Sequence, residues 1–150
     1  MENKLKLTTE EATRLINLLK YKIENPTIEF PAFGKKIELE VVAKETPDKF
    51  TININRGNKN VDKCTYQGRT STSNVPLLRL DIGKTIQYMN PDGGKIMGNH
   101  LHIYTEEYEM GQAVSFNISD PDLYNNCLEF FKKFNLLMGE TNIIYQEQLA

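Results

Sequence analysis

The chain has 150 residues, of which 39% are hydrophobic and 25% are charged, and its formal net charge at pH 7 is −2. This length fits one domain with its own core, and the composition excludes a fibrous or disordered protein. No apolar run approaches the roughly 20 residues of a membrane span, and the first eight residues lack the apolar segment of a signal peptide. We therefore expect one domain over residues 1–150, in the cytoplasm and without a membrane partner.

The first predicted element is a helix that begins at Thr8 or Thr9. Behind this capping threonine, apolar residues recur with helical spacing at Ala12, Leu15, Ile16, Leu18, Leu19 and Ile23. The pattern predicts a helix that ends near Asn25-Pro26.

Six segments after this helix have the sequence character of β-strands. They lie at 35–43, 50–55, 61–70, 75–82, 99–105 and 113–118. The strongest turn signal in the chain is Asn90-Pro91-Asp92-Gly93-Gly94, which separates the fourth of these strands from the fifth. Because short turns join consecutive strands, we expect the strands to pair antiparallel.

A second helix is predicted to begin within 119–122, where serine or aspartate can cap the helix and Pro121 fits its first turn. Its apolar face consists of Leu123, Cys127, Phe130, Phe131 and Phe134. The final NIIYQ segment, 142–146, predicts a short edge strand or a docked tail. The fold class is therefore α+β, with a central antiparallel sheet of five or six strands between an N-terminal and a C-terminal helix.

Charge and cysteine content restrict the partners. From Arg56 to Lys84, six basic residues stand against two acidic ones, so this segment has a net charge of +4. Such a segment suits a phosphate-facing surface, and it also suits an ordinary solvated surface. Cys64 and Cys127 are far apart and form no Cys-x-x-Cys motif, so we expect two free thiols and no structural zinc site.

The only two histidines, His100 and His102, lie in the segment GGKIMGNHLHIY. Residues two apart on a strand share a face, so both imidazoles and Tyr104 are expected on one face, with the histidine ends about 7 Å apart. Leu101 and Ile103 then face the core. This division of the strand is the most specific chemical signal in the sequence.

One interpretation of the pair is acid–base chemistry on a phosphodiester. Two imidazoles near their ordinary pKa of about 6.5 can hold opposite protonation states, so one accepts a ribose hydroxyl proton and the other protonates the leaving oxygen. Lys63, Arg69 and Arg79 precede the histidines on two strands whose polar faces are expected to join theirs, and they can bind the phosphate. This mechanism needs no metal or cofactor. It predicts an RNA-directed protein, a small ribonuclease of the toxin kind.

A second interpretation is a non-enzymatic interaction protein. Exposed histidine, tyrosine and arginine side chains on one sheet face are also typical of binding surfaces. The protein is then an inhibitor or a defence-related factor of a mobile element, and the same face binds a protein or a nucleotide.

A third interpretation is a metal site. Gly94, His100, His102 and Glu106 match the first half of the motif found in cupins, and Gly111 comes two residues early for its closing glycine. Two imidazoles and a carboxylate suit iron, manganese or zinc. The chain has no further histidine for the second half of that motif.

Several ordered motifs resemble a known family. They read LTTEEATRLINLLK, INRG, DKCTYQGR, LLRLDIG, NPDG and HLHIY. Their order, from Leu7 to about Phe131, resembles a family of small bacterial proteins described only as domain of unknown function 6978. The resemblance implies no activity, but the shared motifs include Lys63, Gln67, Arg69, Arg79, Asn90, His100, His102 and Tyr104. We therefore expect Gln67, Asn90 and Tyr104, together with Tyr88 just before the NPDG turn, to support the site.

Overall fold

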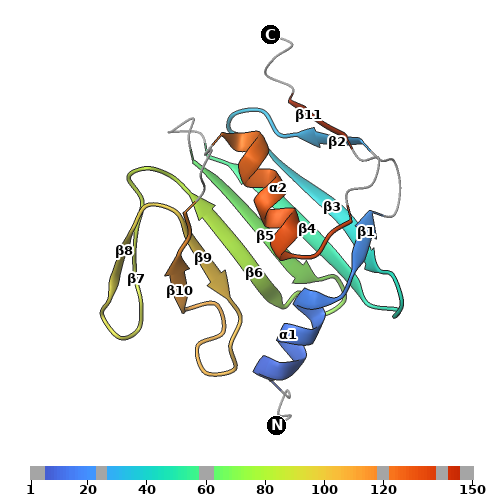
Figure 1. Ribbon diagram of the computed structural model, residues 1–150, viewed down its shortest axis with the longest axis horizontal. Coiled ribbons are helices and arrows are strands. Elements are labelled where there is room, and N and C mark those ends of the chain that lie inside the picture. The colour runs from blue at the N-terminus through green and yellow to red at the C-terminus, as the bar shows by residue number, and fades with distance from the viewer. Residues whose placement is uncertain (1–5, 23–26, 58–62, 118–121, 138–141, 146–150) are drawn as a thin grey trace.

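The computed structural model describes residues 6–22, 27–57, 63–117, 122–137 and 142–145 (Figure 1). Its elements in chain order are α1 (Thr9–Asn17), β1 (Lys20–Lys22), β2 (Thr27–Phe30), β3 (Lys36–Ala43), β4 (Lys49–Arg56), β5 (Cys64–Thr70), β6 (Pro76–Ile82), β7 (Gln87–Met89), β8 (Lys95–Met97), β9 (His100–Ile103), β10 (Ala113–Ser115), α2 (Leu123–Lys133) and β11 (Asn142–Tyr145). The predicted α+β class is confirmed.

One large antiparallel sheet dominates the fold. Its seven strands follow the order β1-β3-β4-β5-β6-β9-β10, which is one strand more than the upper end of the prediction. All six predicted strands are present, and the additional strand is β1. Two smaller sheets accompany it, the antiparallel pair β7–β8 and the parallel pair β2–β11.

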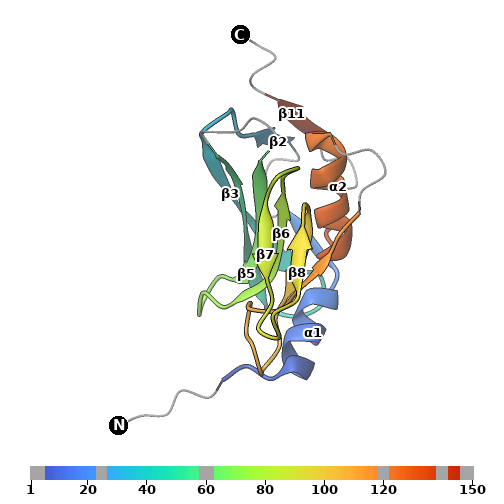
Figure 2. The ribbon, with the colours of Figure 1, turned by 90° about the vertical axis from the view of Figure 1, so that its left-hand side faces the viewer.

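Both helices cover the same face of this sheet (Figures 1 and 2), so the prediction that the sheet lies between them is wrong. The burial along β4 gives the physical reason. Phe50, Ile52 and Ile54 are fully buried and belong to the same core as both helices, whereas the alternate residue Asn53 is only half-buried. Because only one face of the sheet is apolar, only that face gains free energy when it is covered.

Helix α1 ends at Asn17, well before the predicted end. Thr8 caps its N-terminus, where Oγ1 accepts a hydrogen bond of 3.0 Å from the amide of Glu11. Leu18 is already extended, and the chain continues into β1, where Lys20 pairs with Ala43 of β3. Strand pairing therefore overrides the helical spacing of the apolar residues after Asn17. In the described part of the chain, neither helix has enough apolar length to cross a membrane.

The elements that the sequence did not predict are short. β1, β7 and β8 have three residues each and β2 has four, so none shows a full alternating pattern. The NPDG segment forms the turn between β7 and β8, where Gly93 has a φ of 90°. Segment 142–146 does contain a strand, but its parallel pairing with β2 joins distant parts of the chain.

Cys64 and Cys127 are buried free thiols, as predicted. Burial raises the pKa of the Cys64 thiol to about 12 and that of Cys127 well above its ordinary value. Burial therefore disfavours the thiolate of both residues, which is the form in which a cysteine acts as a nucleophile.

Lys20 is a fully buried lysine that joins both helices to the sheet. Its Nζ donates to the carbonyl oxygens of Ile16 (2.7 Å), Leu18 (2.9 Å) and Phe134 (2.7 Å). The same nitrogen lies 4.1 Å from the centre of the Phe134 ring, within the range of a cation–π contact. Burial nevertheless lowers the pKa of Lys20 to about 7.

This lysine predicts a stability that depends on pH. The folded protein releases the Lys20 proton near pH 7, whereas the unfolded chain keeps it until about pH 10.4. Because the unfolded state binds more protons in this window, the free energy of unfolding is expected to rise by about 2 kcal/mol from pH 7 to pH 9. Urea unfolding at both pH values measures it. If the free energy of unfolding of the variant Lys20→Met rises equally between these pH values, the pH dependence does not come from Lys20.

Candidate functional site

The strand register places the predicted polar residues on one face. On β6, Asp81 lies between Thr65 of β5 and His100 of β9. Arg79 lies in the same way between Gln67 and His102. The polar faces of these three strands therefore adjoin, as the sequence analysis expected.

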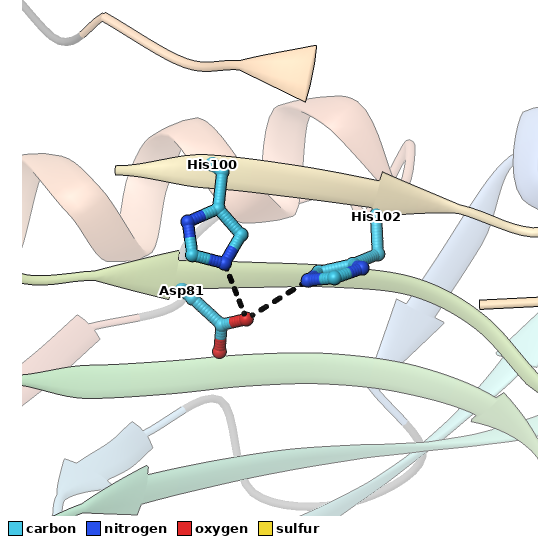
Figure 3. A group of neighbouring side chains, drawn as sticks. All are labelled: Asp81, His100 and His102. Atoms are coloured by element: carbon cyan, nitrogen blue, oxygen red, sulfur yellow. Dashed lines mark ion pairs between the residues drawn. The ribbon is translucent and has the colours of Figure 1, made fainter. Parts of the chain in front are cut away.

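Asp81, His100 and His102 form a compact triad (Figure 3). The Oδ2 atom of Asp81 lies 3.2 Å from Nε2 of His100 and 3.2 Å from Nε2 of His102. Figure 3 shows the carboxylate directed from β6 toward both imidazoles, which come from β9. The histidines therefore converge on one oxygen atom, and their ring centres are only 5.0 Å apart.

Backbone carbonyl groups fix the other nitrogen of each imidazole. Nδ1 of His100 lies 2.9 Å from the carbonyl oxygen of Gly98, and Nδ1 of His102 lies 2.8 Å from that of Met110. A carbonyl oxygen can only accept a hydrogen bond, so each Nδ1 carries a proton. In a neutral imidazole the lone pair is then on Nε2, and both lone pairs face Asp81.

Arg79 and Thr65 complete the hydrogen bonds of the carboxylate. The Arg79 guanidinium lies 3.1 Å from Oδ2, and Thr65 Oγ1 donates to Oδ1 at 3.0 Å. Burial raises the pKa of Asp81, but the neighbouring His102, the charge of Arg79 and the hydrogen bond of Thr65 together outweigh this effect and hold the pKa below its ordinary value. Asp81 is therefore ionised at neutral pH.

The β7–β8 hairpin covers the imidazoles. The ring of Tyr88 stacks on His100 at a centre distance of 5.4 Å and meets His102 edge-on at 4.7 Å. Its hydroxyl donates to the carbonyl oxygen of Gly111, and the Asn90 amide exchanges two hydrogen bonds with the backbone of Ala113. Tyr88 and Asn90 therefore hold the hairpin against the histidines, which are only 3% and 1% exposed.

A pocket of about 450 Å³ lies beside the triad. Its lining includes Asp81 and His100, the hydroxyl-bearing side chains of Thr65 and Tyr88, and the basic side chains of Lys63 and Arg79. His102 is not part of the lining. A molecule in this pocket can therefore contact two cationic side chains and two of the three triad residues, Asp81 and His100.

Two predicted residues lie elsewhere. Arg69 turns toward β3 and β4, where its guanidinium bonds to Glu38 and Asn53, and it also bonds to Asn74 in the turn between β5 and β6. The prediction that Tyr104 shares the histidine face is wrong, because β9 ends at Ile103 and Tyr104 packs into the core with its hydroxyl bonded to the Leu7 carbonyl. Gln67 is on the same face as Arg79 but is not part of the pocket lining.

The carboxylate of the triad is not the one that the cupin-like spacing suggested. Glu106 is exposed, and its amide donates to Thr9 Oγ1 near the start of α1. Sequence reasoning missed Asp81 as a partner of the histidines, because the two segments are about twenty residues apart and only the register brings them together. The available signal was the pair of charged residues in β6, Arg79 and Asp81, which alternate with buried leucine and isoleucine residues.

The triad is a candidate metal-binding site. Its three candidate ligand atoms lie within 4.8 Å of one another. Metal–ligand bonds of about 2.0–2.2 Å place neighbouring ligand atoms about 3 Å apart, which agrees with the two 3.2 Å separations between Nε2 and Oδ2. Two imidazoles and one carboxylate also leave positions open for water or substrate.

Comparison with known proteins identifies a family but no activity. A family model described as "Family of unknown function (DUF6978)" matches residues 7–142. The match includes the whole seven-stranded sheet, the β7–β8 hairpin and the triad. No curated protein and no solved structure matches the chain.

Proposed function

The chain belongs to this family of unknown function (DUF6978), whose description assigns no activity, and from the site geometry we propose a divalent-metal-dependent enzyme of the hydrolytic kind. Asp81, His100 and His102 hold the ion. One observation carries the proposal: both Nε2 atoms converge on a single carboxylate oxygen while both Nδ1 atoms bind backbone carbonyl groups.

The surroundings of the triad suit a transition metal. Hydrogen bonds from Nδ1 to carbonyl groups are the usual means by which proteins orient metal-binding histidines. Imidazole ligands favour zinc, iron or manganese over magnesium and calcium. Thr65 orients Asp81 from the side opposite the imidazoles, and Tyr88 restricts the access of water. A bound ion supplies a Lewis acid or an activated water molecule at the edge of the pocket.

The geometry is less favourable to the metal-independent mechanism. The two imidazoles converge instead of standing about 7 Å apart on either side of a phosphodiester, and both nitrogen atoms of each ring already have partners. An RNA substrate stays a prediction, supported by Lys63 and Arg79 in the pocket.

The interaction-protein alternative also stays a prediction, and one observation favours it. Across β3 to β5, no helix or strand of the described residues covers the sheet face opposite the helices (Figure 2). That face carries polar residues such as Glu38, Asn53 and Arg69, which bond to one another across the strands. A binding partner on this face would not need the triad.

Metal-dependent stability tests the proposal. A ligand that binds only the folded state at 100 times its Kd stabilises it by about 2.7 kcal/mol. We therefore expect Mn²⁺ or Zn²⁺ to raise the melting temperature of untagged protein, EDTA to reverse the shift, and one ion per chain to remain after gel filtration. RNA cleavage, if RNA is the substrate, should likewise be lost in EDTA.

The double variant His100→Ala/His102→Ala provides the control for this experiment. It is expected to bind no ion and to show no metal-dependent shift. An equal shift in the double variant, or no bound ion in the wild type, would contradict the proposed function.

A further inference from the structure

Arg79 occupies the contacts that a metal ion needs. Its Nη2 atom lies 3.1 Å from Oδ2 of Asp81 and 3.2 Å from Nε2 of His102. A guanidinium nitrogen can only donate, so at His102 it uses the Nε2 lone pair. Arg79 therefore engages two of the three ligand atoms of the triad.

An ion and these Arg79 contacts exclude each other. An ion bonded to Oδ2 and Nε2 needs the His102 lone pair that the guanidinium now uses. It would also lie close to a positive charge in a mostly buried site, where the repulsion is screened only weakly. Binding of an ion at the triad therefore requires Arg79 to move away.

The pocket offers Arg79 a second position. The side chain is 34% exposed and already lines the pocket, so it can turn outward without crossing the core. Lys63 lines the same pocket and is exposed. A released guanidinium presents its donors in a planar fork that matches phosphate oxygens, and a nearby ammonium group adds a second positive charge.

We propose that a divalent ion displaces Arg79 from Asp81 and His102, and that the released Arg79 binds a phosphate group in the pocket together with Lys63. The inference rests on the proposed metal site and adds the class of ligand and the order of binding. Metal and phosphate then bind with positive coupling, because each favours the outward position of Arg79. Coupling of this kind is reciprocal and is expected to be about 10-fold.

The variant Arg79→Gln tests the exchange through two effects of opposite sign. Removal of the competing cation is expected to tighten Mn²⁺ binding about 10-fold. Loss of the phosphate ligand is expected to weaken binding of inorganic phosphate to the Mn²⁺-loaded protein about 10-fold. Isothermal titration calorimetry measures both affinities. Adenosine monophosphate and a short RNA, titrated in parallel, distinguish free phosphate from a phosphate ester.

Two further variants exclude indirect effects. Arg79→Lys keeps the positive charge, so its Mn²⁺ affinity is expected to stay near that of the wild type while phosphate binding weakens. Lys132→Gln removes an exposed lysine from α2, which covers the opposite face of the sheet, and is expected to change neither affinity.

The outcomes separate this inference from the proposed function. If Arg79→Gln binds Mn²⁺ more weakly than the wild type, or if phosphate coupling is unchanged in it, the exchange is refuted while the metal site stands. If neither protein binds Mn²⁺, the proposed function is refuted as well.

Discussion

Replacement of Asp81 by asparagine is expected to lower the affinity for Mn²⁺ or Zn²⁺ by at least about 100-fold. Loss of a residue that only orients a metal ligand typically costs 10–100-fold in affinity, and in the proposed site Asp81 is itself a ligand, through the oxygen that both imidazoles face. Asparagine keeps the shape of the side chain but removes its charge. Competition with a chelating dye measures the two affinities.

Two variants make this prediction specific. Thr65→Val removes the hydrogen bond to Oδ1 and is expected to cost about 10-fold, as an orienting residue should. Glu106→Gln removes the carboxylate that the cupin-like spacing suggested and is expected to have no effect. Retention of metal by Asp81→Asn, or an equal loss in Glu106→Gln, would contradict the assignment of the ligands.

The second large effect concerns the core beneath the sheet. Replacement of Phe134 by alanine is expected to lower the free energy of unfolding by about 3–5 kcal/mol. Phe134 is fully buried, meets Phe50 edge-on at 5.7 Å, stacks on Phe130 at 5.9 Å and lies against Lys20 Nζ. Urea unfolding measures the loss. Phe33→Ala, at a half-exposed phenylalanine, should cost only about 1 kcal/mol.

Gly68 gives a sharper test of the same packing. A Cβ atom at this position would lie 2.5 Å from Cζ of Phe134, so Gly68→Ala alone is expected to cost about 1–3 kcal/mol. In the Phe134→Ala background the ring is absent, and the cost should largely disappear. Equal costs in both backgrounds would show that the Phe134 ring is not the reason why position 68 needs a glycine.

Local sequence patterns predicted the parts of the fold that local physics determines. The hairpin of β3 and β4 follows from alternating apolar residues on both sides of a short turn. Helix α2 begins at Leu123, directly after its N-cap residue Asp122, whose carboxylate accepts from the amide of Asn125 and which lies in the segment that the capping pattern indicated. Each of these features depends on residues close together in the sequence.

Nonlocal contacts determined what the sequence did not predict. The early end of α1 depends on the pairing of β1 with β3, and β2 depends on a partner at the other end of the chain. The position of both helices on one face follows from the burial of the whole sheet. None of these contacts leaves a local pattern of its own.

The site could be predicted only in part, because some of its contacts lie within one strand and others join separate strands. His100, His102 and Arg79 were identified from the alternation of residues on single strands, and the structure brings them together. The role of Asp81 depends on the register between β6 and β9, which no single strand reveals. The position of Tyr104 was predicted wrongly because side chains alternate between the two faces only within a strand. β9 ends at Ile103, one residue before Tyr104.

The most direct test of the metal site is an anomalous difference map from crystals grown with Mn²⁺. We predict one peak about 2.0–2.2 Å from Oδ2 of Asp81 and from Nε2 of both His100 and His102, with the Arg79 guanidinium turned into the pocket. A map in which Mn²⁺ is bound only at exposed carboxylates such as Glu106, or in which no peak lies at the triad, would contradict the account.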